Sequence, residues 1–170
     1  QKYIQKSISN IYEWKSNGSI TYDPSCGIIT VIGIVPSTHF EMWGKISLLG
    51  EKIYFKEVTK IQEQLDITCI ELHYENNSIE TIPDNFDPKC DKLDLSNNKI
   101  KDIQVTWNPQ NCKYIDLSGN GITYIPKYWK TKASKNSITV KIDDHILYIP
   151  LNIRQYYTHY KAKHIKSVVI

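Results

Sequence analysis

The sequence predicts a repeat solenoid built on a parallel β-sheet, and three observations lead to that prediction. The last three of the four cysteines (Cys26, Cys69, Cys90 and Cys112) are 21 and 22 residues apart, and regular spacing of this length indicates a repeat. Each of these three cysteines begins a segment with the same apolar pattern. Beyond each segment, further apolar residues recur at equal offsets, so one structural unit is repeated along the chain.

The three central repeats share the pattern L-x-x-L-x-L-x-x-N-x-L, with cysteine at the first apolar position. They are Cys69–Ile79, Cys90–Ile100 and Cys112–Ile122. The L-x-L core alternates with a period of two, as in a strand that buries one face, and each repeat adds one strand to the sheet. The ninth residue follows the strand, where the amide of an asparagine can bond backbone groups that the strand ladder leaves unpaired. We therefore expect a ladder of Asn77, Asn98 and Asn120 along the solenoid.

Weaker repeats extend the pattern in both directions. The apolar residues that follow the central repeats are Ile82 and Phe86, Ile103 and Trp107, and Ile125 and Trp129. Toward the C-terminus, Val140 and Ile142 predict a strand, and residues 146–153 repeat the apolar offsets. We expect the carboxylate pair Asp143–Asp144 to replace the asparagine in this last turn.

The N-terminal elements are predicted from the same pattern. Residues 28–35 form the longest apolar run, interrupted by Thr30 and Gly33, and indicate a strand. Residues 46–53 fit L-x-L-x-x-N-x-L with Glu51 in the asparagine position, which predicts a strand at 46–48. Apolar spacing of three and four in residues 56–65 then predicts a short amphipathic helix.

The segments LDLSNNKI (residues 93–100) and IDLSGNGI (residues 115–122) resemble the consensus of the leucine-rich repeat family. The strong match covers residues 69–129. The resemblance implies an α/β-type solenoid of about five or six turns, with a parallel β-sheet on the concave face and an irregular, short helical or 3-10 convex side. The expected division is an N-terminal cap at 1–19, the solenoid at 20–153, and a basic C-terminal cap or tail at 154–170.

The composition is consistent with one domain and a lean core. The chain has 170 residues, of which 41% are hydrophobic, and a formal net charge of +3. No stretch approaches the roughly 20 apolar residues that a membrane-spanning helix needs. The charge is uneven, because residues 1–126 hold 12 Lys/Arg against 16 Asp/Glu, whereas residues 127–170 hold 9 against 2.

The cysteines favour an intracellular location. Secreted leucine-rich repeat proteins commonly close their ends with disulfide-bonded cysteine clusters, and this sequence has none. All four cysteines are expected to be internal thiols, which favours a reducing compartment such as the cytoplasm or nucleus. Two potential glycosylation sites, at Asn17 and Asn76, leave secretion open as the alternative.

The motifs predict no enzyme, no metal site and no cofactor. The sequence has no nucleophile elbow, phosphate-binding loop, metalloprotease motif or calcium loop. Neither the cysteines nor the histidines show metal-ligand spacing along the chain. Cys69 and His73 are four residues apart, but the repeat register directs the thiol into the core and the imidazole away from it, so we expect no nucleophilic pair.

The resemblance implies that the concave face binds a partner protein, as in an adaptor. On that fold, positions three, five, seven and eight of each repeat point outward from the strand, and the candidates are taken from the first three of these. The expected partner-binding residues are Glu71, His73, Glu75, Lys92, Asp94, Ser96, Tyr114, Asp116, Ser118, Lys141 and Asp143. The panel is largely polar and tilted toward negative charge, so the expected partner carries basic or hydrogen-bonding groups, with Tyr114 and His73 as its main anchors.

Two other functions stay open at this stage. Lysines and tyrosines interleave in residues 127–166, which suits contact with nucleic acid or an anionic membrane. An extracellular receptor-like or decoy module is the other alternative. The sequence does not indicate the oligomeric state.

Overall fold

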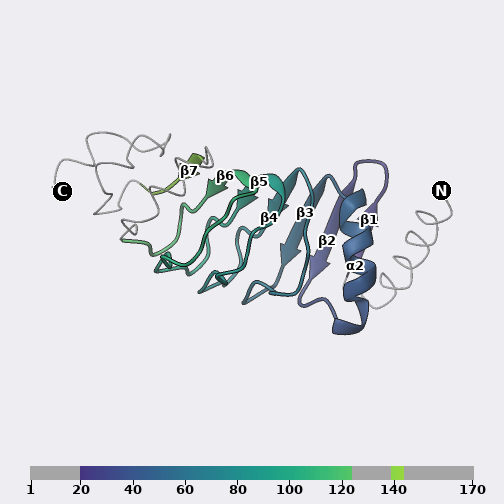
Figure 1. Ribbon diagram of the computed structural model, residues 1–170, viewed down its shortest axis with the longest axis horizontal. Coiled ribbons are helices and arrows are strands. Elements are labelled where there is room, and N and C mark those ends of the chain that lie inside the picture. Colours follow the sequence, from purple (N-terminus) through teal and green to yellow (C-terminus); the bar gives the residue numbers. More distant parts are fainter. Residues whose placement is uncertain (1–19, 124–138, 144–170) are drawn as a thin grey trace.

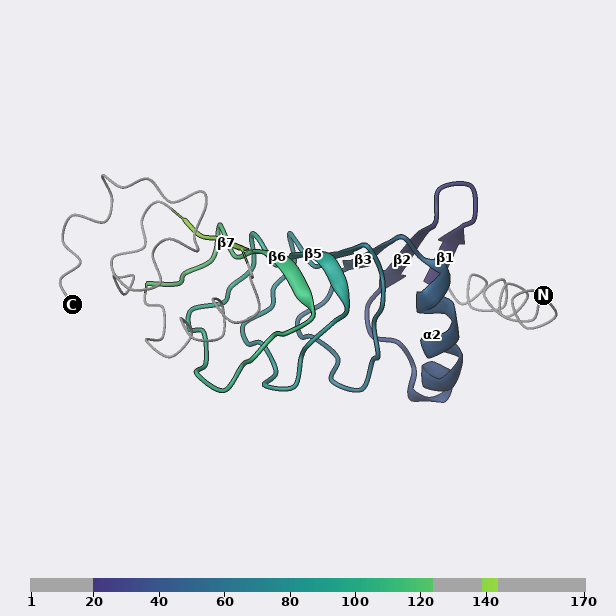
Figure 2. The ribbon, with the colours of Figure 1, turned by 45° about the horizontal axis from the view of Figure 1, so that its top comes forward.

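In the part of the chain that the structure describes, seven strands form one sheet in chain order, and the sheet is the body of a β-solenoid of about four turns. The computed structural model describes residues 20–123 and 139–143. The strands are β1 (Ile20–Asp23), β2 (Ile28–Ile32), β3 (Lys52–Lys56), β4 (Glu71–His73), β5 (Cys90–Asp94), β6 (Cys112–Asp116) and β7 (Thr139–Lys141). Strands β1 and β2 form an antiparallel hairpin, and every later neighbour pairs in parallel. The strands follow one another along the long axis (Figure 1) and line one side of the molecule, with the connecting loops on the other (Figure 2).

The predicted central register is confirmed. Leu72 pairs with Leu93, Leu93 with Ile115, and Ile115 with Val140, so the fourth repeat positions form one buried row. The apolar residues of the loops are buried as expected: Ile82, Phe86, Ile103 and Trp107. The Trp107 indole N–H also donates to the Phe86 carbonyl oxygen at 2.7 Å, which ties two successive loops together.

The predicted asparagine ladder is also confirmed. Asn77, Asn98 and Asn120 each accept a hydrogen bond from the preceding repeat, whose donors are the backbone N–H groups of Val58, Ile79 and Ile100 at 3.0–3.1 Å. Each amide nitrogen donates to a carbonyl of the preceding repeat and to carbonyls of its own turn. The ladder therefore joins each repeat to the one before it.

The N-terminal register predicted for residues 46–53 is wrong. Residues 37–49 form the 3-10 turn η1 (Ser37–His39), the helix α2 (Phe40–Ile46) and the 3-10 turn η2 (Ser47–Leu49). Trp43 and Ile46 are both buried, and their spacing of three is that of one helix face. The strand instead begins at Lys52, where Ile53 and Phe55 alternate into the core. Helix α2 lies beside β1 and β2 at the N-terminal end of the described sheet (Figure 1).

The amphipathic helix predicted for residues 56–65 is also wrong. Lys56 ends β3, and the residues after it are extended or turn-like. Glu57 has a φ of 58°, which a right-handed helix does not allow, and the Val58 N–H bonds the Asn77 side chain. Val58 and Ile61 are buried at a spacing of three, but they lie in a loop and not in a helix.

The cysteines differ in exposure. Cys26 is exposed in the turn between β1 and β2, so the expectation that it lies inside the core is wrong. Cys69 is half-buried, and Cys90 and Cys112 are buried as expected. The Cys90 and Cys112 sulfur atoms lie 3.5 Å apart on neighbouring strands as free thiols, and their hydrogen bond, with burial, raises the pKa of Cys90.

Several predictions fall on residues outside the described ranges. They are the N-terminal cap at 1–19, the loop residues Ile125 and Trp129, the repeat at 146–153, and the tail at 154–170. The predicted count of five or six turns covered residues 20–153, of which 124–138 and 144–153 lie outside the described ranges, whereas the described part has about four. Among the described residues, no helix is long and apolar enough to cross a membrane.

Candidate functional site: the outer sheet face

All eleven predicted partner-binding residues lie in three rows across β4 to β7, on the face of the sheet that points away from the core. We call this surface the outer sheet face. Row three holds Lys52, Glu71, Lys92 and Tyr114. Row five holds Tyr54, His73, Asp94, Asp116 and Lys141. Row seven follows two residues later and holds Lys56, Glu75, Ser96, Ser118 and Asp143.

His73 lies on this face, but its neighbours bury it. Its residue exposure is only 7%. The ring nitrogen Nε2 lies 2.9 Å from Glu71 Oε1, and Nδ1 lies 3.0 Å from both carboxylate oxygens of Glu75. A partner would therefore meet the two glutamates before it met the imidazole, which is less accessible than the sequence suggested.

Tyr54 covers one face of the His73 ring, and the sequence prediction missed it. The two rings are stacked, with centroids 4.2 Å apart and an interplanar angle of 9°. Tyr54 belongs to β3, which the incorrect N-terminal register had placed elsewhere. The alternation of Ile53, Tyr54 and Phe55 between core and outer face was the signal that could have identified it.

Two lysines on the face form ion pairs with carboxylates on the neighbouring strand. Lys52 Nζ lies 3.6 Å from Glu71 Oε2, and Lys141 Nζ lies 3.8 Å from Asp116 Oδ2. Burial alone would raise the pKa of Glu71, but the hydrogen bond with His73 and the nearby lysines together lower it. The Glu71 carboxylate is therefore held in its charged form.

The two Asp-x-Ser pairs serve the fold as well as the surface. Asp94 Oδ1 accepts hydrogen bonds from the backbone N–H of Ser96 at 3.0 Å and from its hydroxyl at 2.6 Å. Asp116 and Ser118 repeat both contacts at the same distances. These four residues close their own turns, so part of the predicted panel is explained by local structure.

The remaining residues lie toward the C-terminal end of the face. Lys92, Tyr114 and Lys141 are partly exposed. Partial burial and the carboxylates of Asp116 and Asp94 raise the pKa of Tyr114, so its hydroxyl keeps its proton. The Asp143 carboxylate accepts from the Gly119 N–H at 2.6 and 2.8 Å, so it bonds the preceding turn. This contact differs from that of the ladder asparagines, which accept from a backbone N–H three positions further along the preceding repeat. Asp144 lies outside the described residues.

One cluster on the face has the ligand types of a metal site. Ligand atoms of His73, Glu75 and Asp94 all lie within 4.8 Å of one another. Spacing along the chain did not indicate this cluster, because Asp94 comes from the neighbouring strand β5.

Cys69 and His73 do not form an activated pair. Burial, followed by the charges of Cys112 and Glu71, raises the pKa of the Cys69 thiol to about 12. An activated thiol needs the opposite shift. Both nitrogens of His73 already face carboxylates.

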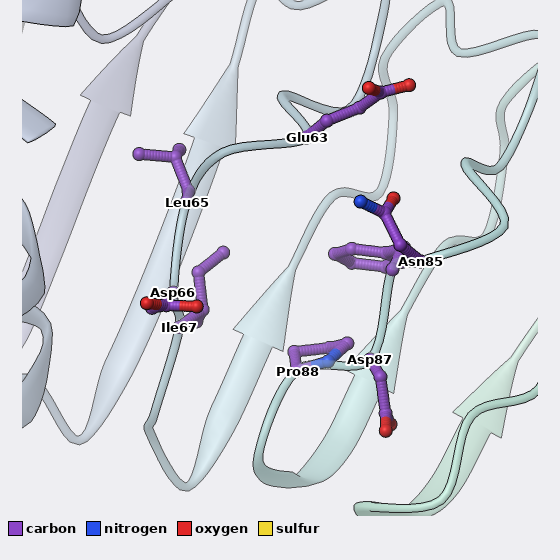
Figure 3. Close-up of a pocket in the computed structure, with 8 residues that line it drawn as sticks. Glu63, Leu65, Asp66, Ile67, Asn85, Asp87 and Pro88 are labelled. Carbon is purple, nitrogen blue, oxygen red and sulfur yellow. The ribbon is translucent and has the colours of Figure 1, made fainter.

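A small pocket lies between two successive loops on the other side of the sheet (Figure 3). Its volume is about 160 Å³. Its lining residues are Glu63, Leu65, Asp66, Ile67, Asn85, Phe86, Asp87 and Pro88. Asp87 is already occupied by two backbone N–H groups and the Asn111 side chain. Binding sites for small molecules are typically about 300 Å³ or larger, so this hollow is a weaker candidate than the outer sheet face.

Searches of protein-family models, of curated proteins and of solved structures found no match to this chain.

Proposed function

We propose that this chain is a non-catalytic interaction module of the leucine-rich repeat type, which binds a partner protein through its outer sheet face. In such a solenoid this face is the concave one. The observation that carries the proposal is the set of three registered rows, which bring side chains from β3 to β7 into one continuous surface. Neighbouring strands are about 4.8 Å apart, so a bound segment of chain could contact several repeats at once.

The partly exposed residues at the C-terminal half of the face are the best candidates for direct contact. Lys92 and Tyr114 are neighbours in row three, and both side chains are partly exposed. Aromatic side chains commonly dominate the free energy of binding at protein interfaces. We therefore assign the anchoring role to Tyr114, with His73 in a supporting position beneath the two glutamates.

The partner's chemistry follows from the acidic groups of the same rows. Glu75, Asp94 and Asp116 lie around the centre of the face, and among the described residues only Asp116 has a lysine beside it within 4 Å. This arrangement suits a partner segment with lysine or arginine side chains. The alternative of nucleic-acid or lipid binding concerns residues 127–166, almost all of which lie outside the described ranges, and it stays a prediction.

The test is partner capture from cells of the source organism, followed by affinity measurement with the purified partner. Tyr114→Ala and Glu75→Lys are expected to weaken binding at least about tenfold, the range of an interface anchor, and Glu75→Lys does so because it repels a basic segment. Asp91→Lys is the matched control for the charge reversal, because Asp91 is an exposed carboxylate on β5 outside the three rows. Equal affinities for all three variants would contradict the proposal.

An intracellular location is proposed on the same footing. Titration of the denatured, unreduced protein should then give four thiols. A count below four would favour the secreted alternative.

A further inference from the structure

We propose that His73, Glu75 and Asp94 form a binding site for a divalent transition-metal ion of the Zn²⁺ type, with Glu71 as the residue that orients the imidazole. This site lies within the outer sheet face, but it does not depend on the proposed partner. It also differs from the sequence prediction, which found no metal-ligand spacing along the chain.

The first observation is that the His73 ring faces carboxylates on both of its nitrogens. Nε2 lies 2.9 Å from Glu71, and Nδ1 lies 3.0 Å from Glu75. A neutral imidazole carries only one N–H, so the second nitrogen would turn a lone pair toward a carboxylate. Only a second proton or a cation between nitrogen and carboxylate resolves that contact.

The second observation is that the ring is held in one orientation. Tyr54 stacks on its face at 4.2 Å, and the His73 side chain is only 9% exposed. The contact with Glu71 Oε1 is the arrangement by which metal-binding histidines usually donate their other N–H to a carboxylate. It leaves Nδ1, the nitrogen that faces Glu75, as the metal ligand.

Asp94 supplies a third ligand from the neighbouring strand. His73 and Asp94 are register partners on β4 and β5. The Ser96 turn uses Asp94 Oδ1, so Oδ2 is the oxygen that can turn toward the ion. One oxygen of the Asp94 carboxylate thus stabilises the turn, and the other is available to bind the ion.

The ligand atoms of His73, Glu75 and Asp94 need to move only slightly closer together to bind one ion. Zinc binds nitrogen and oxygen at about 2.0–2.2 Å, so two ligands of one ion are at most about 4.4 Å apart. The present ligand atoms lie within 4.8 Å of one another. Glu75 and Asp94 are both partly exposed, and a small side-chain rotation of either would bring the set into range.

The ligand set favours zinc-like ions over magnesium or calcium. One imidazole with two carboxylates is a mixed nitrogen and oxygen set, whereas Mg²⁺ and Ca²⁺ prefer oxygen alone. Three protein ligands leave further coordination positions for water or for a group of a bound molecule. The surrounding charge also favours a cation, because among the described residues Lys52 is the one lysine within ion-pair distance of Glu71, Glu75 or Asp94.

The experiment is a competition titration of the full chain with Zn²⁺ and a chromophoric chelator. Asp94→Asn is the main variant, because it keeps an oxygen that can accept from Ser96 while removing the charged ligand. We expect one zinc ion per wild-type chain and an affinity at least about 100-fold lower in Asp94→Asn. Glu71→Gln should lower the affinity about 10- to 100-fold, the usual cost of losing a group that orients a ligand.

Asp116→Asn is the matched control, because Asp116 makes the same turn contacts one strand away and lies outside the cluster. Its zinc affinity should equal that of the wild type. A second readout is the nitrogen resonance of the His73 ring in ¹⁵N-labelled protein, which distinguishes a metal on Nδ1 from a proton. Absence of zinc binding, equal affinity in Asp94→Asn and Asp116→Asn, or an unchanged His73 resonance on zinc addition would each overturn the proposal.

Discussion

The N-terminal and the central turns of the described solenoid share a positive φ at one position but are held by different side chains. In every turn that follows β2 to β6, the residue after row seven adopts a positive φ. These residues are Gly33 (75°), Glu57 (58°), Asn76 (58°), Asn97 (54°) and Gly119 (70°). The central turns use asparagine or glycine, which tolerate this conformation, whereas the turn after β3 uses glutamate.

The amide that holds each turn also differs between the two regions. A central turn carries its own asparagine, and Asn98 makes four hydrogen bonds from a side chain that is 8% exposed at the residue level. At the N-terminal end, the side-chain amide of Gln62 stabilises the turn after β2, although Gln62 itself lies in the loop after β3. Its amide accepts from the Val35 N–H at 3.1 Å and donates to the Val35 carbonyl at 2.8 Å.

The positive-φ turn is therefore a property of the fold, and the consensus asparagine is only one of the side chains that can stabilise it. A buried backbone group needs a partner, but the partner can come from the same turn or from the next loop. A pattern search detects the first solution and misses the second.

The largest expected effect comes from removing a ladder asparagine. Asn98→Ala leaves the buried Ile79 N–H without its acceptor and opens a gap in the ladder. We expect a loss of about 2–4 kcal/mol in the free energy of unfolding, measured by chemical denaturation. Gln62→Ala should cost about 1–2 kcal/mol, because its partly exposed site lets water replace the amide. Equal losses would mean that the two amides are equivalent and would remove the distinction between the regions.

These turns also explain how much of the fold could be predicted. The sheet register of β4 to β7 and the asparagine ladder were predictable, because LDLSNNKI and its neighbours carry the full pattern. Strand β3 was not, because its turn has glutamate and valine where the central repeats have two asparagines or glycine and asparagine. The loop after β3 also has fewer residues between strand and buried apolar position, so a fixed-length pattern does not align with it.

The candidate site was predictable to the same extent. The rows of β4 to β7 follow from the repeat positions, and all eleven residues lie in them. The burial of His73 does not, because it depends on Tyr54 from the strand that was missed and on glutamates that bend back over the ring. Side-chain rotation and contacts between strands are not encoded in spacing along one repeat.

The second prediction compares two glycines at the same turn position. Gly33 and Gly119 both have positive φ, so alanine strains either site by about 1–2 kcal/mol. A Cβ on Gly33 meets open space, whereas a Cβ on Gly119 would overlap the Asn97 side chain and would lie close to the Asn97 backbone nitrogen, at 3.1 Å. Gly119→Ala should therefore cost at least about 1 kcal/mol more than Gly33→Ala in the free energy of unfolding. Identical costs would show that the backbone strain alone governs both turns.

The third prediction concerns the core at the junction of the two regions. Tyr74 stacks on Phe55 with centroids 4.4 Å apart, and its buried hydroxyl has no hydrogen-bond partner among the residues that the structure describes. Burial, with the nearby Cys69, raises the pKa of this hydroxyl, which stays protonated and polar in an apolar site. Tyr74→Phe should raise the free energy of unfolding by about 1 kcal/mol, because it removes the unpaired group and keeps the ring. A destabilised variant would mean that the hydroxyl has a partner, such as a buried water.

The smallest expected effect tests the turn after β3 directly. Glu57 is exposed and holds a φ of 58°, a conformation that glutamate adopts at a cost and asparagine adopts more readily. Glu57→Asn should therefore raise the free energy of unfolding by about 0.5–1 kcal/mol. Glu57→Gln is the matched control, because it removes the charge but keeps the long side chain, and it should leave stability unchanged. If the two variants are stabilised equally, the charge is responsible, and the β3 turn differs from the central turns by electrostatics rather than by backbone strain.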